Sequence, residues 1–493
     1  MSVPPTGYLS TAAIEASVQF IAGNFPAIAT LIPLHEHSVE GRAIHAVKIA
    51  NGGGANRRGV LLIAGVHARE IVNPDALVTL ALKLCQAYTN GTGLSFGGKN
   101  YSAEQIALIV DALDVVICPL VNPDGRTYVQ SPAGQAMWRK SRALNPGQPC
   151  RGVDLNRNFD FLWSSGIGTS SSSCSDVFKG PSAFSEPETR NVRHLLDDYP
   201  NIGYFIDVHS YSELILYPWG DDDNQTSDPS QNFQNPVYNG QRGVVGAGYR
   251  EYIPAFDLDW YLITGARIRD AIAAVRGRTY TLQQSIGLYP TSATSDDYGY
   301  SRTFVDSQKR KVRSLTVETG QEFQPVPSEG QQIIDEVDAG LLEFLLAALC
   351  AVEQAARLTD QTRSLTGLRR VRDRASTTSG AARRYLEMAE RHSGELASLL
   401  ATDEALLTDV GAALQKLSSL VSSPDKTLDQ KLAGILHELG TRLAALASDA
   451  LREDIETVQR ELPDLTGRTL DQIVGDSPNS GKPPATRGRR NTR

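Results

Sequence analysis

The stretch LLIAGVHAREIVNPDAL, residues 61–77, decides how the fold is interpreted. A run of apolar residues ends at His67, Arg69 and Glu70 follow within a few positions, and a helical pattern begins near Pro74. A continuously apolar run is typical of a strand that is covered on both faces of a sheet. Functional side chains of open α/β sheets collect at the carboxyl ends of strands. The stretch therefore predicts a buried strand that delivers His67 and Glu70 to the edge of a sheet.

The same alternation of β-rich and helical patterns continues to about residue 355. Strands are predicted at 59–66, 113–121, 202–209, 212–218 and 312–318, and helices at 73–88, 103–112, 186–198, 259–276 and 330–353. Strands that alternate with helices favour a single α/β domain over residues 1–355. We expect a mixed, mostly parallel twisted sheet with helices on both faces.

The sequence changes character after residue 355. Leucines recur at steps of three and four, which is the apolar spacing of packed or coiled-coil helices. We predict an α-helical extension over 356–462, with a basic helix near 357–375 and two antiparallel helices at 380–422 and 424–460. Residues 463–493 are rich in proline, glycine and basic residues toward their end, and we expect a disordered basic tail. The helical extension is a candidate for oligomerisation or for docking a partner.

Composition and charge exclude several classes of protein. The chain has 493 residues, 41% of them hydrophobic, and a net charge of −8, which does not indicate a nucleic-acid binder. No run approaches the roughly 18 apolar residues that a membrane-spanning helix requires. The N-terminus has no basic cluster followed by an apolar core, as a signal peptide would. From these features we predict a cytoplasmic protein without a membrane span, with non-classical export as the alternative.

Two further strand ends carry chemically suggestive residues. The strand predicted at 202–209 ends in His209, and the strand at 312–318 ends in Glu318. Two histidines and one glutamate form a zinc ligand set that leaves a coordination position open for water. A second glutamate, not bound to the metal, is what a hydrolase needs to accept a proton from that water. An HxxE pattern alone is weak evidence, because a histidine at a strand end is more often a hydrogen-bonded structural residue.

A series of motifs strengthens the hydrolase hypothesis. GVHARE (65–70), MWRKSR (137–142), GVDLNRNFD (152–160), FIDVHSYSELILYPWG (205–220), LYPTSATSDDYGYS (288–301) and SLTVETG (314–320) occur in this order. Together they resemble the zinc carboxypeptidase family typified by the pancreatic carboxypeptidases A and B, over about residues 7–350. The resemblance implies one Zn²⁺ ion held by His67, Glu70 and His209, with Glu318 as the general base.

The resemblance also implies a set of substrate contacts. Arg139 would polarise the scissile carbonyl, and Asn156 and Arg157 would grip the terminal carboxylate of a peptide. Tyr289 would lie on a loop that closes over the substrate, and Arg69 would be a further contact. A planar guanidinium matches a carboxylate, and a charged hydrogen bond of this kind contributes roughly 1.5–3 kcal/mol. These residues predict a zinc-dependent exopeptidase that acts on the C-termini of peptides or proteins.

Three finer inferences follow from the resemblance. Asp296 occupies the position at the base of the family's specificity pocket, where a buried carboxylate favours a basic partner, so we expect a preference for C-terminal Lys or Arg. Asp154 is expected to orient His67. Cys150 and Cys174 bracket the Asn-Arg motif as a cysteine pair does in the pancreatic enzymes, and the sequence leaves open whether they form a disulfide.

Two other functions remain open on the sequence alone. A related zinc amidohydrolase would act on peptidoglycan stem peptides or acylated amino acids. Relatives of that kind can depart from the Asn-Arg clamp and the tyrosine loop, both of which this sequence retains. A scaffold that binds C-termini without cutting them is the non-enzymatic alternative, and the intact Glu318 and ligand set count against it.

Overall fold

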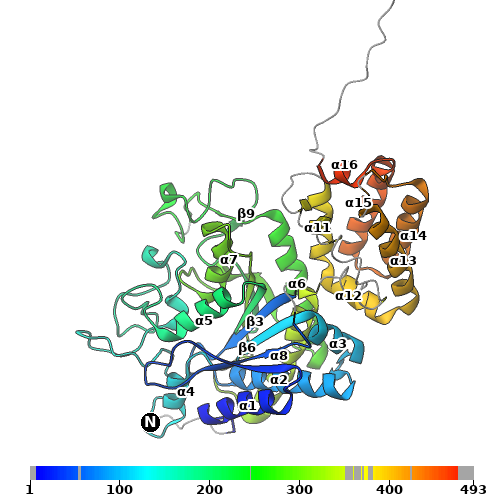
Figure 1. Cartoon of the computed structure of the whole chain (residues 1–493). Coiled ribbons are helices and arrows are strands. Elements are labelled where there is room, and N and C mark those ends of the chain that lie inside the picture. Colours follow the sequence, from blue (N-terminus) through cyan, green and yellow to red (C-terminus); the bar gives the residue numbers. More distant parts are fainter. Residues whose placement is uncertain are drawn as a thin grey trace, which may run out of the picture. The chain divides into compact units, whose positions relative to one another are not determined.

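The structure is a computed structural model that describes residues 7–349 except 54–56 and 245, and 381–475 except 422 and 424, with a few isolated positions between 359 and 375. Contacts along the chain divide it into two compact units, Met1–Leu349 and Cys350–Arg493 (Figure 1). The first unit holds every residue that the sequence links to catalysis.

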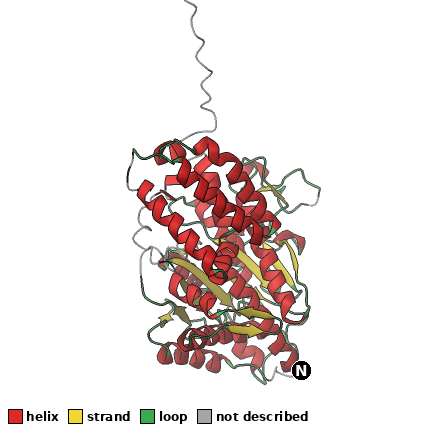
Figure 2. Cartoon of the chain, turned by 90° about the vertical axis from the view of Figure 1, so that its right-hand side faces the viewer, coloured by secondary structure: helices red, strands yellow, loops and turns green. Residues whose placement is uncertain are grey.

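The first unit is built on a twisted mixed sheet, drawn in yellow in Figure 2. Its strands lie in the order β1-β2-β6-β3-β7-β12-β8-β11. They are β1 (Ala29–Pro33), β2 (His45–Ile49), β3 (Arg58–Ala64), β6 (Leu113–Cys118), β7 (Ile202–His209), β8 (Leu214–Tyr217), β11 (Thr281–Gln284) and β12 (Arg313–Glu318). Two small sheets join β4 (Leu94–Phe96) to β5 (Lys99–Tyr101) and β9 (Asn224–Gln225) to β10 (Glu251–Tyr252).

The centre of the sheet is parallel and its flanks contain antiparallel pairs. β6, β3, β7 and β12 run parallel to one another, whereas β1–β2, β2–β6 and β12–β8 are antiparallel. Parallel neighbours end at the same edge of a sheet. The register pairs Glu318 of β12 directly with His209 of β7, so the two predicted catalytic strand ends lie side by side. The predicted mixed sheet is confirmed.

Helices cover both faces of this sheet. They are α1 (Thr11–Asn24), α2 (Val72–Asn90), α3 (Ala103–Ala112), α4 (Pro123–Gln130), α5 (Pro187–Asp198), α6 (Ala255–Arg276), α7 (Ser295–Val305) and α8 (Pro327–Ala348). Successive strand residues point to opposite faces. Tyr204 of β7 packs its ring against Trp260 of α6 and Phe344 of α8, whereas Phe205 lies against Gly299 of α7. α6 and α8 therefore cover one face and α7 the other.

Short 3-10 helices lie in the loops between these elements. They are Leu155–Arg157, Trp163–Ser165, Pro236–Tyr238 and Ser285–Gly287. Among the described residues of either unit, we find no helix with the length and apolar character needed to cross a membrane.

The second unit is helical in its described part, and its helices differ from the prediction. Two long helices were expected at 380–422 and 424–460. The structure instead has α11 (Ala381–Arg391), α12 (Ser393–Thr402), α13 (Glu404–Val421), α14 (Gln430–Leu446), α15 (Asp449–Leu465) and α16 (Leu470–Gly475). The expected basic helix at 357–375 falls almost entirely outside the described residues.

Capping residues explain the shorter helices. The backbone N–H of Leu406 donates to Asp403, that of Leu432 donates to Asp429, and that of Leu451 donates to Ser448. Aspartate and serine at these positions satisfy the free N–H groups of a new helix start, which favours a break over continuation. The predicted start of the second helix at 424 is wrong for the same reason, because Asp429 caps α14 and α14 begins at Gln430.

The helical unit uses its leucines internally. Leu400, Leu406 and Leu414 form a buried cluster against which Leu439 and Leu443 pack. A second cluster gathers Leu428, Leu432 and Leu462. The predicted disordered tail was placed at 463–493, but α15 extends to Leu465 and α16 follows it; residues 476–493 lie outside the described part.

Candidate metal centre and active site

The end of β3 delivers two of the predicted metal ligands. Gly65 has φ +65°, and a Cβ at this position would lie 2.7 Å from the Leu120 side chain. A glycine is required where the backbone adopts this conformation in so close a contact. The chain can therefore turn sharply after the strand, which carries His67 and then Glu70 into the site.

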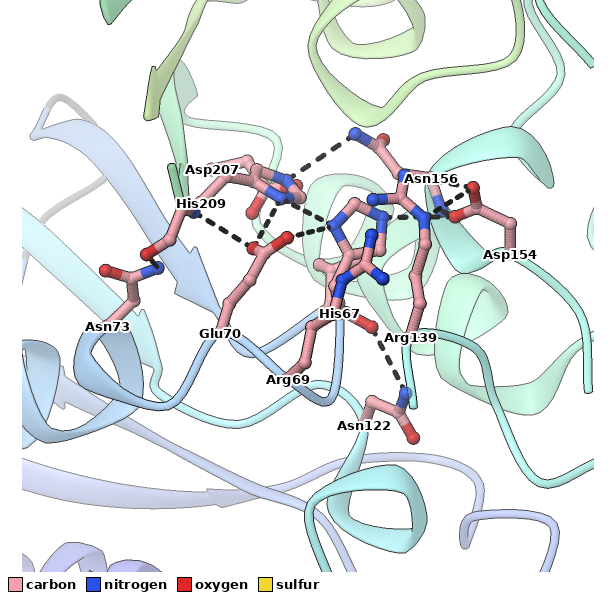
Figure 3. Close-up of polar contacts among 12 residues, drawn as sticks. His67, Arg69, Glu70, Asn73, Asn122, Arg139, Asp154, Asn156, Asp207 and His209 are labelled. Atoms are coloured by element: carbon pink, nitrogen blue, oxygen red, sulfur yellow. Dashed lines mark hydrogen bonds and ion pairs between the residues drawn. The ribbon is translucent and has the colours of Figure 1, made fainter. Parts of the chain in front are cut away.

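The third predicted ligand meets the first two across the sheet edge. His67 Nδ1 lies 2.7 Å from Glu70 Oε1, and His209 Nδ1 lies 3.0 Å from Glu70 Oε2. The two Nδ1 atoms are 3.1 Å apart. One ligand atom from each of the three buried residues lies within 4.8 Å of the others. Figure 3 shows the three side chains pointing toward one another. The sequence prediction that His67, Glu70 and His209 converge is confirmed.

Each imidazole is oriented by a buried carboxylate on its other nitrogen. His67 Nε2 lies 3.1 Å from Asp154 Oδ1, and His209 Nε2 lies 2.9 Å from Asp207 Oδ2. A neutral imidazole that donates through Nε2 presents an unprotonated Nδ1. The two Nδ1 atoms and the Glu70 carboxylate are then acceptors that face one another without a donor between them. Such a cluster needs positive charge at its centre.

The charges of the site fit a divalent cation. Burial by itself would lower the pKa of His209, but Asp207 and Glu70 outweigh it and raise that pKa well above its usual value. Burial would likewise raise the pKa of Glu70, but the two imidazoles hold it well below its ordinary range. Both pKa shifts show that positive charge is stabilised between these residues, and either a proton or a metal ion can supply it. Two imidazoles and one carboxylate are the donor set that Zn²⁺ accepts in sites with an open position.

Glu318 lies at the end of β12 beside this ligand set. Its side chain is partly exposed, but its Oε2 is buried and has no hydrogen-bond partner in the described part of the chain. Burial raises the pKa of Glu318 to about 8, and the negative charge of Glu70 adds to this, while His209 and Arg139 oppose it. A bound cation would favour the ionised form. A carboxylate with a free oxygen next to a candidate metal site is placed to exchange protons.

Arg139 is fixed beside the ligands by Asp154. Its Nε and Nη2 each lie 3.0 Å from Asp154 Oδ2. Asn122, which lies below Arg139 in Figure 3, supports this arrangement. Its amide donates to the carbonyls of Val66 and Lys140 and so ties the two loops together. Burial by itself would raise the pKa of Asp154, but the positive charge of Arg139 and the contact with His67 outweigh it. The pKa of this carboxyl therefore lies far below its usual range. Asp154 thus orients both a predicted ligand and the predicted carbonyl-polarising arginine.

Arg157 offers a free donor on the same side of the sheet. Its Nε donates to the Gly168 carbonyl at 3.0 Å and its Nη1 to the Asn156 carbonyl at 2.6 Å. Its buried Nη2 has no partner among the described residues. Tyr289, half-exposed, lies with its ring centroid 5.8 Å from the guanidinium. A buried N–H that lacks an acceptor is costly, so this position is suited to a ligand carboxylate.

The other predicted substrate residues occupy different surroundings. Asn156 Oδ1 accepts from the backbone N–H of Ser295 at 2.8 Å, and its Nδ2 lies 3.5 Å from His209 Nε2. Arg69 stacks 4.1 Å above the Phe323 ring and donates to the Met137 carbonyl. The structure thus holds Asn156 within the core of the site and Arg69 at its rim.

Asp296 is buried at the start of α7. Its Oδ2 accepts from Ser285 Oγ at 3.3 Å, and its carbonyl accepts from Ser314 Oγ at 2.6 Å. No ion pair involves Asp296 within the described ranges. The predicted place of Asp296 at the base of a specificity pocket stays a prediction.

Cys150 and Cys174 form a disulfide, which resolves the question that the sequence left open. The bond closes the loop that carries Asn156 and Arg157. Disulfides are typical of oxidising compartments. The cytoplasmic location stays a prediction.

Sequence reasoning missed Asp207 and a ring of neutral side chains beneath the ligands. Asn73 Nδ2 donates to Ser210 Oγ at 3.0 Å, and Thr319 Oγ1 donates to Asn73 Oδ1 at 2.7 Å. Ser210 Oγ lies 3.0 Å from Thr319 Oγ1, and the Ser210 N–H donates to Glu70. One signal was available, because Asp207 and His209 are two residues apart in a strand and so share a face.

Fold and site together define an α/β metalloprotein whose ligands stand on the ends of parallel strands. The chain belongs to the zinc carboxypeptidase family, whose model matches residues 14–339. It is 36% identical over 226 residues to carboxypeptidase B of Helicoverpa zea, covering 45% of this chain and 48% of that protein. It is 29% identical over 311 residues to carboxypeptidase B of Bos taurus, covering 62% and 64%.

A solved structure shows the same fold. Carboxypeptidase A of Helicoverpa armigera matches with a TM-score of 0.55 and 27% sequence identity, covering 69% of this chain and 73% of that one. The chain spans about half the length of the first curated relatives it matches.

Proposed function

We propose that the protein is a zinc-dependent exopeptidase that releases the last residue of peptides or proteins. The observation that carries this proposal is the free Nη2 of Arg157, buried in the same unit as the His67–Glu70–His209 site. A guanidinium donor without an acceptor supports binding of a terminal carboxylate. A hydrolase that requires this carboxylate cuts at the C-terminus.

The chain's own residues support the steps of such a reaction. Zn²⁺, when bound, supplies Lewis-acid chemistry and lowers the pKa of a water to about 7. Arg157 would hold the substrate carboxylate, with Asn156 and Tyr289 beside it. Arg139, locked by Asp154, would offer fixed N–H groups to the oxygen on which negative charge develops. Glu318 would accept a proton through its free Oε2 and return it to the leaving amine.

We further propose a preference for C-terminal Lys or Arg. Asp296 is buried, and the one side-chain contact described for its carboxylate is with the hydroxyl of Ser285. A substrate cation would compensate its charge. This preference rests on Asp296, and Asp296→Asn should remove it while leaving cleavage of a peptide ending in leucine.

A matched pair of peptides tests the proposed function. One peptide has a free C-terminus and its twin has an amidated one, and the release of the last residue is followed by mass spectrometry with and without a chelator. We expect cleavage of the free peptide alone, and loss of cleavage with the chelator. Equal cleavage of the amidated peptide would identify an amidohydrolase, and tight binding without cleavage would identify a scaffold.

A further inference from the structure

Asp207 is a fully buried carboxylate in contact with a predicted metal ligand. It lies in β7 two residues before His209, so both side chains point to the same face of the sheet. Its Oδ2 lies 2.9 Å from His209 Nε2 and accepts from Ser295 Oγ at 2.6 Å. Its Oδ1 has no hydrogen-bond partner in the described part of the chain. Figure 3 shows Asp207 beside His209.

The contact fixes which nitrogen of His209 faces the ligand set. Nε2 faces two groups, the Asp207 carboxylate and, at 3.5 Å, the amide nitrogen of Asn156. The carboxylate is the acceptor and it is closer, so Nε2 carries the proton. Nδ1 then has a lone pair directed at Glu70 and His67, which is the arrangement that a metal ligand needs.

Asp207 differs from Asp154, the carboxylate that orients the other histidine. Asp154 shares its charge with Arg139, which lies 3.0 Å away. Asp207 contacts a hydroxyl and an imidazole and forms no ion pair with an arginine or lysine among the described residues. More of its negative charge therefore acts on the imidazole. A carboxylate behind a histidine raises the basicity of the nitrogen that binds the metal.

Ser295 connects this carboxylate to the substrate side of the site. It is the first residue of α7, its hydroxyl donates to Asp207, and its backbone N–H donates to Asn156 Oδ1. The next residue is Asp296. Asp207 thus holds His209 on one side and the start of the helix that carries the specificity residue on the other.

We propose that Asp207 is a positioning residue that fixes the tautomer of His209, strengthens its binding to the metal, and anchors Ser295 at the start of α7. The inference rests on the proposed function only in naming the metal as zinc.

The test measures zinc binding directly. Asp207→Asn keeps the shape of the side chain and removes its charge. We expect the zinc dissociation constant, measured by competition with a chromogenic chelator, to rise by about 10- to 100-fold, as for other residues behind metal-bound histidines. The matched control is Asp338→Asn, which also removes a fully buried carboxylate but lies on α8, where its partner is Lys83. Its zinc affinity should equal that of the parent.

Ser295→Ala provides a second measurement if Asp207→Asn fails to fold. This variant removes one hydrogen bond to Asp207, so we expect the zinc dissociation constant to rise by about 2- to 10-fold. Ser295→Thr restores a hydroxyl and should restore the affinity. In the double variant Asp207→Asn/Ser295→Ala, the two effects should be less than additive, because they act through one contact.

The outcomes separate this inference from the proposed function. A parent protein that fails to bind zinc would overturn the proposed function. A parent that binds zinc while Asp207→Asn and Ser295→Ala bind it equally well would overturn the role of Asp207 alone. A loss of affinity in Asp338→Asn as large as in Asp207→Asn would also overturn it, because the effect would then be one of general destabilisation.

Discussion

At the scale of single residues, Glu318 is the side chain whose chemistry can be separated most cleanly from metal binding. Glu318→Gln keeps the size of the side chain and removes its ability to accept a proton. General bases contribute typically about 10²- to 10⁴-fold, so kcat should fall within that range. Because Glu318 is not one of the three converging ligands, the zinc content measured by mass spectrometry should remain that of the parent. Loss of zinc together with activity would contradict the role of proton acceptor.

Arg157 gives a second test at this scale, with the substrate as its control. Arg157→Ala removes the free buried donor. Loss of a charged hydrogen bond should weaken binding of a peptide with a free C-terminus by about 1.5–3 kcal/mol, roughly 10- to 150-fold in KM. A peptide amide lacks the matching charge, so its weak binding should change little. Equal losses for both peptides would show that Arg157 supports the fold of its loop and not the carboxylate.

The individual residues also show what a sequence can and cannot reveal about a site. His67, Glu70, His209 and Glu318 stand at strand ends, where the topology of a parallel sheet brings distant residues together. Asp207 was missed although His209 lies two positions along the same strand, because a shared face does not by itself show that two side chains are in contact. Its contact with Ser295 becomes visible only when α7 is placed against β7.

At the scale of elements, the disulfide stabilises the loop that carries Asn156 and Arg157. Cys150 and Cys174 are 24 positions apart. In the chain-entropy model, closing a loop of this length lowers the entropy of the unfolded chain and so stabilises the folded state by about 3 kcal/mol. Cys150→Ser/Cys174→Ser should lower the free energy of unfolding by about that amount, measured by denaturant titration. Reductant should destabilise the parent and leave the double variant unchanged, and an effect of reductant on the variant would point to another cause.

Helix α5 contains a carboxylate that makes stability depend on pH. Burial, assisted by Glu186 and Asp124, raises the pKa of Glu188 to about 8. Between the unfolded pKa of about 4.5 and about 8, the native state keeps a proton that the unfolded state has released. Stability contributed by this group is therefore lost as pH rises through that window, at up to about 1.4 kcal/mol per pH unit.

Glu188→Gln should abolish this dependence. The variant should be more stable than the parent at pH 8, and the difference should vanish toward pH 4.5, as measured by thermal unfolding across the range. The exposed Glu104→Gln is the control and should show no gain at pH 8. A gain in Glu188→Gln that is the same at every pH would mean that packing, and not a proton, is responsible.

Elements were predicted best where their pattern was strong and least well where a single polar residue ends a helix. The apolar runs at 59–66 and 202–209 became β3 and β7, which are buried along their whole length. The leucine repeat after residue 380 correctly indicated helices but not their ends. Asp403 and Ser448 cap new helices inside that repeat, and a periodic pattern of leucines cannot show such a break.

At the scale of the whole molecule, the two units have separate cores. The ligand set, Glu318 and the predicted substrate residues all lie between residues 67 and 318, inside Met1–Leu349. The leucines of the second unit pack among themselves, so the leucine repeat is buried in contacts within this unit. Oligomerisation or docking through this unit stays a prediction without support from the described contacts.

This separation predicts how the chain tolerates shortening. A chain that ends at residue 355 keeps the complete sheet and α8, so its kcat/KM on a short peptide should stay within about twofold of the parent, which corresponds to roughly 0.4 kcal/mol.

A chain that ends at residue 326 loses α8, and with it Phe344, whose ring packs on Tyr204 of β7 and Trp260 of α6. Burying an aromatic side chain contributes about 1.5–3 kcal/mol, and α8 carries several other buried residues, so this shorter chain should not fold. Circular dichroism would show whether each shortened chain folds, and a peptide-cleavage assay would measure its activity. A large loss of activity in the folded chain ending at 355 would show that the helical unit takes part in catalysis after all.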